Sequence, residues 1–145
     1  MSNATDALAR RVAEHMLARE GTGPHWGIVI EEAREGYARL SMVVRADMLN
    51  GHRTAHGGMI FALADTAFGL ASNSHGAVAA GIDAHITYQV AVQAGDVLTA
   101  NAIEITRSRR LGVYRVDVTR ADGTPVSSFT GTVYVTSQPH DTKHP

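Results

Sequence analysis

The segment from Gly57 to Ser74 constrains the fold more than any other part of this chain, because it has the length of a helix and a single charged side chain, Asp65. A helix that is apolar on nearly all sides belongs inside a protein. An ionised carboxylate is costly there, so it is usually retained for chemistry or by a buried partner. The preceding His56 and the pair Gly57-Gly58 predict a helix start with free backbone N–H groups, which attract anions. A carboxylate and such a helix end in apolar surroundings are the groups that acyl transfer requires.

Size and composition place the chain among ordinary single-domain proteins. It has 145 residues, of which 44% are hydrophobic and 19% charged. We expect one domain over residues 1–136, followed by a flexible tail at 137–145. The net charge of −1 favours neither nucleic acid nor an anionic membrane as a partner.

The same composition predicts a cytoplasmic protein. The chain contains no cysteine, which excludes disulfides and cysteine nucleophiles and fits a reducing compartment. Its first residues lack the apolar core of a secretion signal. The central segment contains Asp, Thr, Ser and Asn and falls short of the ~20 predominantly apolar residues that span a bilayer, so we expect no membrane association.

Shorter elements with turn residues between them surround the central helix. A first helix begins near Thr5 or Asp6, either of which can cap it, and Gly21, Gly23 and Pro24 end it. A hairpin with its turn at Glu35-Gly36 follows, and alternating hydrophobicity predicts half-buried strands. Glycine-containing turns favour antiparallel neighbours among the later strands. These predicted strands cover residues 77–92, 97–106, 112–119 and 126–136.

Together these elements predict an α+β fold, in which an antiparallel β-sheet wraps around one long central helix. A sheet of about five or six strands cannot cover every side of an apolar helix. We therefore expect a second chain to complete the enclosure, which makes the protein a homodimer at minimum.

The polar residues around this helix resemble those of one known family. The spacing from Asn50 through His56, Gly57 and Gly58 to Asp65 is similar to that of the hotdog-fold acyl-CoA thioesterases of the phenylacetate-degradation (PaaI-type) branch, and it is more specific than a lone glycine-rich motif. The chain departs from many of these relatives at Ala91-Val92, where they carry an Arg-Pro pair, and near Gly81, where some carry Ser or Thr. The matching segments are Asn50–Gly58, Ala64–Ala67, Asn73–Gly76, Ile86–Tyr88, Ala94–Asp96 and Arg109–Tyr114.

The resemblance implies hydrolysis of an acyl-CoA thioester in a site shared between subunits. It implies no metal and no cofactor, apart from the coenzyme A that is part of the substrate. The family's oxyanion donor corresponds to the backbone N–H of Gly57 and its catalytic carboxylate to Asp65, while Asn50 and His56 match polar positions beside the thioester. A homotetramer built as a dimer of dimers is implied as well. The branch implies phenylacetyl or other aryl acyl groups, and medium-chain acyl groups fit equally.

Taken by themselves, these residues leave their roles open. Asp65 can act as a general base on water or as a nucleophile, or it can be an idle buried carboxyl satisfied by Ser or Thr. Gly57 and Gly58 let a substrate approach the backbone, or they merely permit a tight entry to the helix. Asn50 can donate to a water or a carbonyl, but the dipeptide Asn50-Gly51 alone is better explained as a turn.

Other charged groups also have two interpretations. His52 and His56 have a separation that zinc ligands use, but they lie in a glycine-rich loop without a third ligand, so we predict no metal site. Arg109 and Arg110 belong to a dense basic cluster, Arg107-Ser108-Arg109-Arg110, which either contacts the phosphates of coenzyme A or forms a solvated hairpin tip. Asp83 lies on a strand face that lines either the acyl channel or a subunit interface.

Two alternative functions fit the same resemblance. One is a hotdog hydratase or dehydratase, but those enzymes pair a His with a carboxylate in motifs of different spacing, which we do not find. The other is a non-catalytic module that binds acyl-CoA, which the lack of an accompanying DNA-binding segment disfavours.

Overall fold

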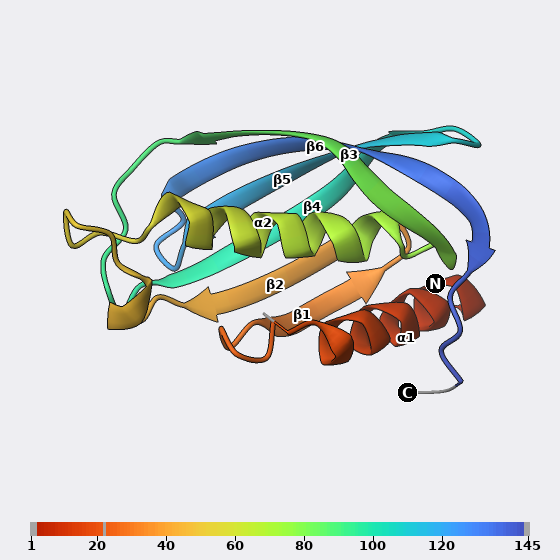
Figure 1. The fold of residues 1–145 in the computed structure, drawn as a ribbon, viewed down its shortest axis with the longest axis horizontal. Coiled ribbons are helices and arrows are strands. Elements are labelled where there is room, and N and C mark those ends of the chain that lie inside the picture. Colours follow the sequence, from red (N-terminus) through yellow and green to blue (C-terminus); the bar gives the residue numbers. More distant parts are fainter. Residues whose placement is uncertain (1–2, 22, 144–145) are drawn as a thin grey trace.

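A six-stranded antiparallel sheet curves around helix α2 in the computed structural model, which describes residues 3–21 and 23–143 (Figure 1). The strand order is β1-β2-β4-β5-β6-β3, and helix α1 packs against β1 at one side of the sheet. This arrangement confirms the predicted α+β fold with its long central helix. The elements are α1 (Ala4–Arg19), β1 (Val29–Arg34), β2 (Tyr37–Val43), a 3-10 turn (Ala46–Met48), α2 (Gly57–Ser72), β3 (Ala77–Tyr88), β4 (Val97–Arg107), β5 (Leu111–Arg120) and β6 (Pro125–Pro139).

Packing against the sheet fixes helix α2. Leu63 is fully buried, and the ring of Phe68 lies 5.9 Å from that of Tyr114 and 5.4 Å from that of Phe129. Gly131 on β6 makes room for this ring, because a Cβ there would come within 2.8 Å of Phe68. Each large side chain buried in this way contributes roughly 1.5–3 kcal/mol. The core therefore lies between one side of α2 and the concave face of the sheet.

Strand β3 differs from its prediction in pairing, and it is partly exposed. It pairs with β6 and lies at the edge of the sheet, whereas the glycine-containing turn before Val97 favours the following strand as its antiparallel neighbour. Ile82 and Tyr88 are 61% and 48% exposed, because no second layer covers this edge in a single chain. A bulge between Gly81 and Asp83 also interrupts the alternation. A turn before Val97 indicates that the chain reverses direction, but it does not indicate which strand becomes the neighbour of β3.

The start of α1 is capped by a residue that the sequence analysis does not single out. The side-chain oxygen of Asn3 accepts hydrogen bonds from the backbone N–H groups of Thr5 at 2.9 Å and Asp6 at 3.4 Å. The prediction of Thr5 or Asp6 as the cap is therefore wrong, because Asn3 lies where its short side chain reaches both free N–H groups. Neither α1 nor any other helix in the described part of the chain has the length and apolar content needed to cross a membrane.

Part of the expected C-terminal tail belongs to the folded structure. Strand β6 continues to Pro139, past the boundary expected at residue 136, because its last residues still pair with β3. Beyond the strand, the backbone N–H of His140 donates to the carbonyl of Gly76 at 2.8 Å, and its Nε2 lies 2.7 Å from Oδ1 of Asn73. These contacts attach the segment to the end of α2.

Candidate functional site

One face of α2 is left open by the sheet. It carries small and polar residues at helical spacing, and Asp65 on this face is exposed in the single chain. The sheet of one chain thus leaves Asp65 uncovered, as expected for a sheet that cannot cover every side of the central helix. The residues of this open face are Gly58, Ala62, Asp65 and Gly69.

The first turn of α2 leaves one backbone N–H without a partner. His56 is the N-cap, and its Nδ1 accepts from the N–H of Gly58 at 2.9 Å, while its carbonyl accepts from Met59 at 2.9 Å and Ile60 at 3.3 Å. Within the described residues, the N–H of Gly57 makes no such bond. Because Nδ1 is an acceptor, the neutral His56 ring carries its proton on Nε2. The helix end thus presents the Gly57 N–H as a free donor, at the positive end of the helix dipole.

Tyr88 holds this first turn from the neighbouring strand. Its hydroxyl donates to the carbonyl of Gly57 at 3.0 Å, and a Cβ on Gly57 would come within 3.2 Å of the Tyr88 ring. Burial raises the pKa of Tyr88, so the hydroxyl stays protonated. Sequence reasoning misses this residue because only the fold brings β3 beside the start of α2.

Asp65 opens onto a cavity of about 310 Å³. Burial by the cavity walls raises the pKa of Asp65, although part of the side chain remains solvent-accessible. No hydrogen bond from the described residues reaches the Asp65 carboxylate, and the adjacent Thr66 hydroxyl donates to the Ala62 carbonyl at 2.7 Å. The carboxylate is therefore available to a ligand or a water. The cavity is lined by Glu20, Asp65, Thr66, Phe68, Gly69 and Gly81.

Asn50 organises the loop before α2. Its side-chain oxygen accepts from the backbone N–H groups of His52 at 2.9 Å and Thr54 at 3.2 Å, as expected for an Asn-Gly turn. Its side-chain amide group remains as a donor beside this loop. His52 itself is exposed. In the described ranges, 3–21 and 23–143, no three His, Cys, Asp or Glu side chains are grouped to hold a metal ion.

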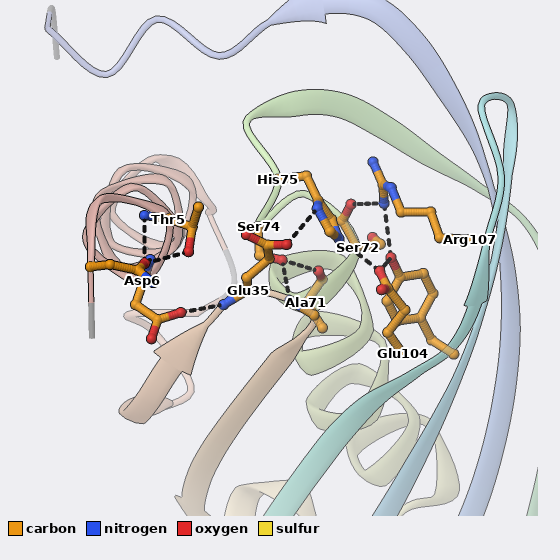
Figure 2. A network of polar contacts seen from close by, with 12 residues as sticks. Thr5, Asp6, Glu35, Ala71, Ser72, Ser74, His75, Glu104 and Arg107 are labelled. Carbon is orange, nitrogen blue, oxygen red and sulfur yellow. Dashed lines mark hydrogen bonds and ion pairs between the residues drawn. The ribbon is translucent and has the colours of Figure 1, made fainter. Parts of the chain in front are cut away.

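The first arginine of the basic cluster has a structural role. Arg107 Nη1 donates to the carbonyl of Ser72 at 2.9 Å (Figure 2). It also donates to the hydroxyl of Tyr114 at 2.8 Å. The Tyr114 hydroxyl in turn donates to Glu104 at 2.5 Å. A cation at a helix C-terminus complements the helix dipole. Arg107 therefore fixes the end of α2 against the sheet, which removes it from the group of candidate phosphate ligands.

The same network holds the segment after α2. His75 Nε2 lies 2.8 Å from a carboxylate oxygen of Glu104. Burial acts to raise the pKa of Glu104, but hydrogen bonds from Tyr114 and His75 hold it below its usual value. Ser74 donates to the carbonyl of Ala71 at 2.6 Å and accepts from a backbone N–H in the β1–β2 turn at 2.8 Å. The polar residues after α2 that contribute to the family resemblance thus stabilise the fold.

Arg109 and Arg110 remain at the tip of the β4–β5 hairpin. Arg109 is exposed, and Arg110 Nη1 donates to the carbonyl of Val135 at 3.4 Å. The bond from Arg107 to Ser72 places this tip at the C-terminal end of α2, away from Gly57 of the same chain. Within one chain, the structure does not bring these arginines together with the free N–H group.

Asp83 is also separate from the group around Asp65. A Cβ on Gly81 would contact Phe68, so Gly81 faces α2. After the bulge, Ala84 pairs with Gly131, which also faces the Phe68 ring, so Ala84 faces α2 as well. Because strand residues alternate, Asp83 points to the opposite face of the sheet. The predicted contact between Asp83 and substrate is therefore not formed within one chain.

The sequence and fold match known proteins. A sequence profile described as the thioesterase superfamily matches residues 52–127. The chain belongs to the thioesterase superfamily. Within it, the chain is 38% identical to the acyl-coenzyme A thioesterase PaaI of Escherichia coli over 119 residues, which cover 82% of this chain and 85% of PaaI.

Solved structures agree with this assignment and confirm the hotdog fold. The structure of E. coli PaaI, from the phenylacetic acid degradation operon, has a TM-score of 0.91 and 34% identity, and the match covers 94% of this chain and 99% of that one. A hypothetical thioesterase from Streptococcus pneumoniae, solved with coenzyme A, has a TM-score of 0.75 and 33% identity, over 78% of this chain and 88% of that one.

Proposed function

We propose that the protein is an acyl-CoA thioesterase whose active site lies between two chains. Gly57 of one chain supplies the oxyanion donor, and Asp65 of the other supplies the base or nucleophile. The observation that carries this proposal is the free Gly57 N–H at the capped start of α2. One such preoriented donor lowers the barrier to acyl transfer by roughly 3 kcal/mol. The names of PaaI and of the coenzyme A-bound relative support acyl-CoA as the substrate class.

The length of α2 is the reason to divide the site between chains. Gly57 and Asp65 lie eight positions apart on one helix. At ~1.5 Å per residue their backbones are separated by about 12 Å. Both groups must lie within ~3 Å of the reacting atoms. Two antiparallel helices satisfy this requirement, because each then supplies one group to each site.

The open surfaces support a two-fold dimer along β3. This strand pairs with β6 alone among the described residues and exposes Ile82 and Tyr88. A long edge strand readily pairs with another strand. A pair of β3 strands about a two-fold axis continues the sheet and turns the open faces of two α2 helices toward each other. This pairing of two chains also encloses Asp65 between them.

The chemistry then follows one of two routes. As a general base, Asp65 removes a proton from water while the water oxygen bonds to the thioester carbonyl carbon. The resulting oxyanion accepts a hydrogen bond from the Gly57 N–H. The carbon–sulfur bond breaks, and the leaving sulfur takes the proton from Asp65, which gives the free acid and coenzyme A. As a nucleophile, Asp65 itself bonds to the carbonyl carbon and expels the thiolate, and water then hydrolyses the mixed anhydride.

A panel of acyl-CoA substrates tests the function and identifies the acyl group. Phenylacetyl-CoA, benzoyl-CoA and octanoyl-CoA are incubated with the protein, and free thiol and residual acyl-CoA are measured. A thioesterase releases thiol and acid in equal amounts. An altered acyl-CoA without thiol indicates a hydratase or dehydratase, and unchanged acyl-CoA that binds the protein indicates a binding module. Either result contradicts the proposed function.

We expect Arg109 and Arg110 to bind the phosphates of coenzyme A. Their hairpin lies at the C-terminal end of α2, which in an antiparallel pair is the end near Gly57 of the partner subunit. Replacing both with Ala should raise KM for acyl-CoA about tenfold, because charge-assisted hydrogen bonds to phosphate are lost. KM for the matching acyl-pantetheine thioester, which lacks the nucleotide, should change little. An equal rise for both substrates would contradict phosphate binding.

A second exposed surface supports a dimer of dimers. Ile103, Leu111 and Tyr134 are 36%, 48% and 44% exposed, and the last two are paired neighbours on β5 and β6. We expect Ile103→Glu to convert a tetramer to a dimer, because a buried unpaired charge is costly at an apolar interface. Analytical ultracentrifugation measures the change, and each dimer should retain hydrolysis. A wild-type protein that sediments as a dimer would contradict the tetramer.

A further inference from the structure

A second carboxyl group faces the cavity that holds Asp65. Glu20 forms the C-cap of α1, and its side chain lines this cavity together with residues of α2 and β3. The buried Gly23 lets the Glu20 carboxyl group pack closely against the backbone, because a Cβ on Gly23 would lie 3.3 Å from Glu20 Oε2. Two carboxyl groups from different helices therefore border one space of about 310 Å³.

The Glu20 side chain has no evident structural use. In the part of the chain that the structure describes, its Oε2 is the one buried side-chain oxygen or nitrogen without a hydrogen-bond partner. An unpaired buried oxygen is destabilising. A negative charge at the end of α1 is unfavourable as well, because the C-terminal end of a helix dipole is itself negative. The Glu20 side chain borders the cavity while its Oε2 is sealed from solvent without a hydrogen-bond partner, so packing alone does not explain this carboxyl group.

Glu20 also borders a second cavity, of about 360 Å³, between α1 and the C-terminal segment. The two cavities have no other lining residue in common. The titratable and charged groups that share these cavities with Glu20 are Asp65 on α2, His15 and Arg19 on α1, and His140 and Asp141 of the C-terminal segment.

The basic side chains among them make contacts with other residues. Arg19 Nη1 lies 3.4 Å from Nε2 of His15, and Nε2 of His140 lies 2.7 Å from Oδ1 of Asn73. Burial lowers the pKa of His140, and the nearby His15 lowers it further, so its ring stays neutral near neutral pH. The charged group that acts on Glu20 is therefore Asp65.

Burial and charge set the order in which the two carboxyl groups lose their protons. Burial raises the pKa of Glu20, and the negative charge of Asp65 raises it further, whereas burial alone raises the pKa of Asp65. Asp65 therefore ionises first, and Glu20 keeps its proton over a range of pH in which Asp65 is already a carboxylate. A protonated carboxyl group can donate a hydrogen bond, which a carboxylate cannot.

We propose that Glu20 is a positioning residue of the active site, whose protonated side chain donates a hydrogen bond to the water that Asp65 activates. This inference rests on the proposed function. The water then donates to Asp65 and accepts from Glu20, which fixes its orientation toward the thioester carbon. The cavity between the two carboxyl groups has room for it.

Two variants of Glu20 separate this role from a structural one. Glu20→Ala removes the donor and should lower kcat about tenfold, with KM changed less than about twofold. Glu20→Gln keeps a donor that cannot ionise, so kcat at the pH optimum of the wild type should stay within about threefold. In the wild type, kcat should fall once the pH is high enough to remove the proton from Glu20. In Glu20→Gln this upper limb of the kcat profile should disappear, while the lower limb set by Asp65 remains.

Glu14→Gln provides a matched control, because Glu14 is an exposed carboxylate on the same helix and pairs with Arg10. It should reproduce the wild-type pH profile. An upper limb that persists unchanged in Glu20→Gln would overturn the proposal. So would a change in KM that depends on the acyl group, which would make Glu20 a substrate contact. Lost thermal stability in Glu20→Ala with kcat and pH profile unchanged would assign Glu20 a structural role.

An NMR titration of the carboxyl groups tests the coupling without substrate. Removing the charge in Asp65→Asn should lower the pKa of Glu20 relative to the wild type, and an unchanged pKa would contradict the coupling. Failure of the proposed function has a different signature, because the wild-type protein would then release no thiol from any acyl-CoA.

Discussion

Asp65→Asn should lower acyl-CoA hydrolysis at least about a hundredfold, because the amide neither accepts a proton from water nor attacks the thioester. The side chain is free to act, since no described residue bonds to its carboxylate and it opens onto a cavity. The measurement is kcat/KM with the best acyl-CoA of the panel. A folded, dimeric variant with more than half of the wild-type activity would contradict a catalytic role.

Stability provides an independent readout for the same variant. Burial raises the pKa of Asp65 in the folded chain, so the folded state binds this proton more tightly than the unfolded state does. Ionised Asp65 therefore destabilises the fold as pH rises above its ordinary pKa. Asp65→Asn should melt at or above the wild-type temperature near neutral pH, and this difference should vanish at acidic pH. Asp117→Asn, at a partly exposed carboxylate that pairs with Arg115, is the matched control and should leave activity unchanged.

Local features of the sequence predict most of the fold. The apolar run after Gly57 predicts α2, and the turn at Glu35-Gly36 predicts the first hairpin, because both signals lie within a few residues. The place of β3 at the sheet edge depends on pairing with β6, whose residues lie 39 to 62 positions further along the chain, and no local signal indicates it.

The candidate site also contains residues that local sequence predicts and residues that it does not. His56 and the free Gly57 N–H follow from a local helix start, so the sequence is sufficient to nominate them. Tyr88 and Glu20 join the site only through tertiary contacts with α2. In the basic cluster, residues that are close in sequence have different environments. Arg107 bonds to the end of α2, whereas Arg109 remains exposed. Composition cannot distinguish residues that differ only in what the fold brings near them.

Mixing two inactive variants should restore activity if the site is shared between chains. Gly57→Pro removes the oxyanion donor and should lower kcat about 10²–10³-fold. The backbone tolerates it, because proline suits the first position of a helix and His56 already has the extended conformation that precedes proline. Gly57→Ala is the matched control. It also adds a Cβ near Tyr88 but keeps the N–H, so the difference between the two variants measures the donor itself.

The second partner in the mixture is Asp65→Asn. In a statistical mixture half of the dimers are hybrids, and each hybrid holds one site with both Gly57 and Asp65 intact and one site with neither. Activity should therefore recover to about a quarter of the wild-type value, whereas each variant alone stays nearly inactive. Subunit exchange is verified with two differently labelled chains. If exchange is complete and no activity returns, Gly57 and Asp65 do not act on one thioester from different chains, and the division of the site across the β3 interface must be abandoned.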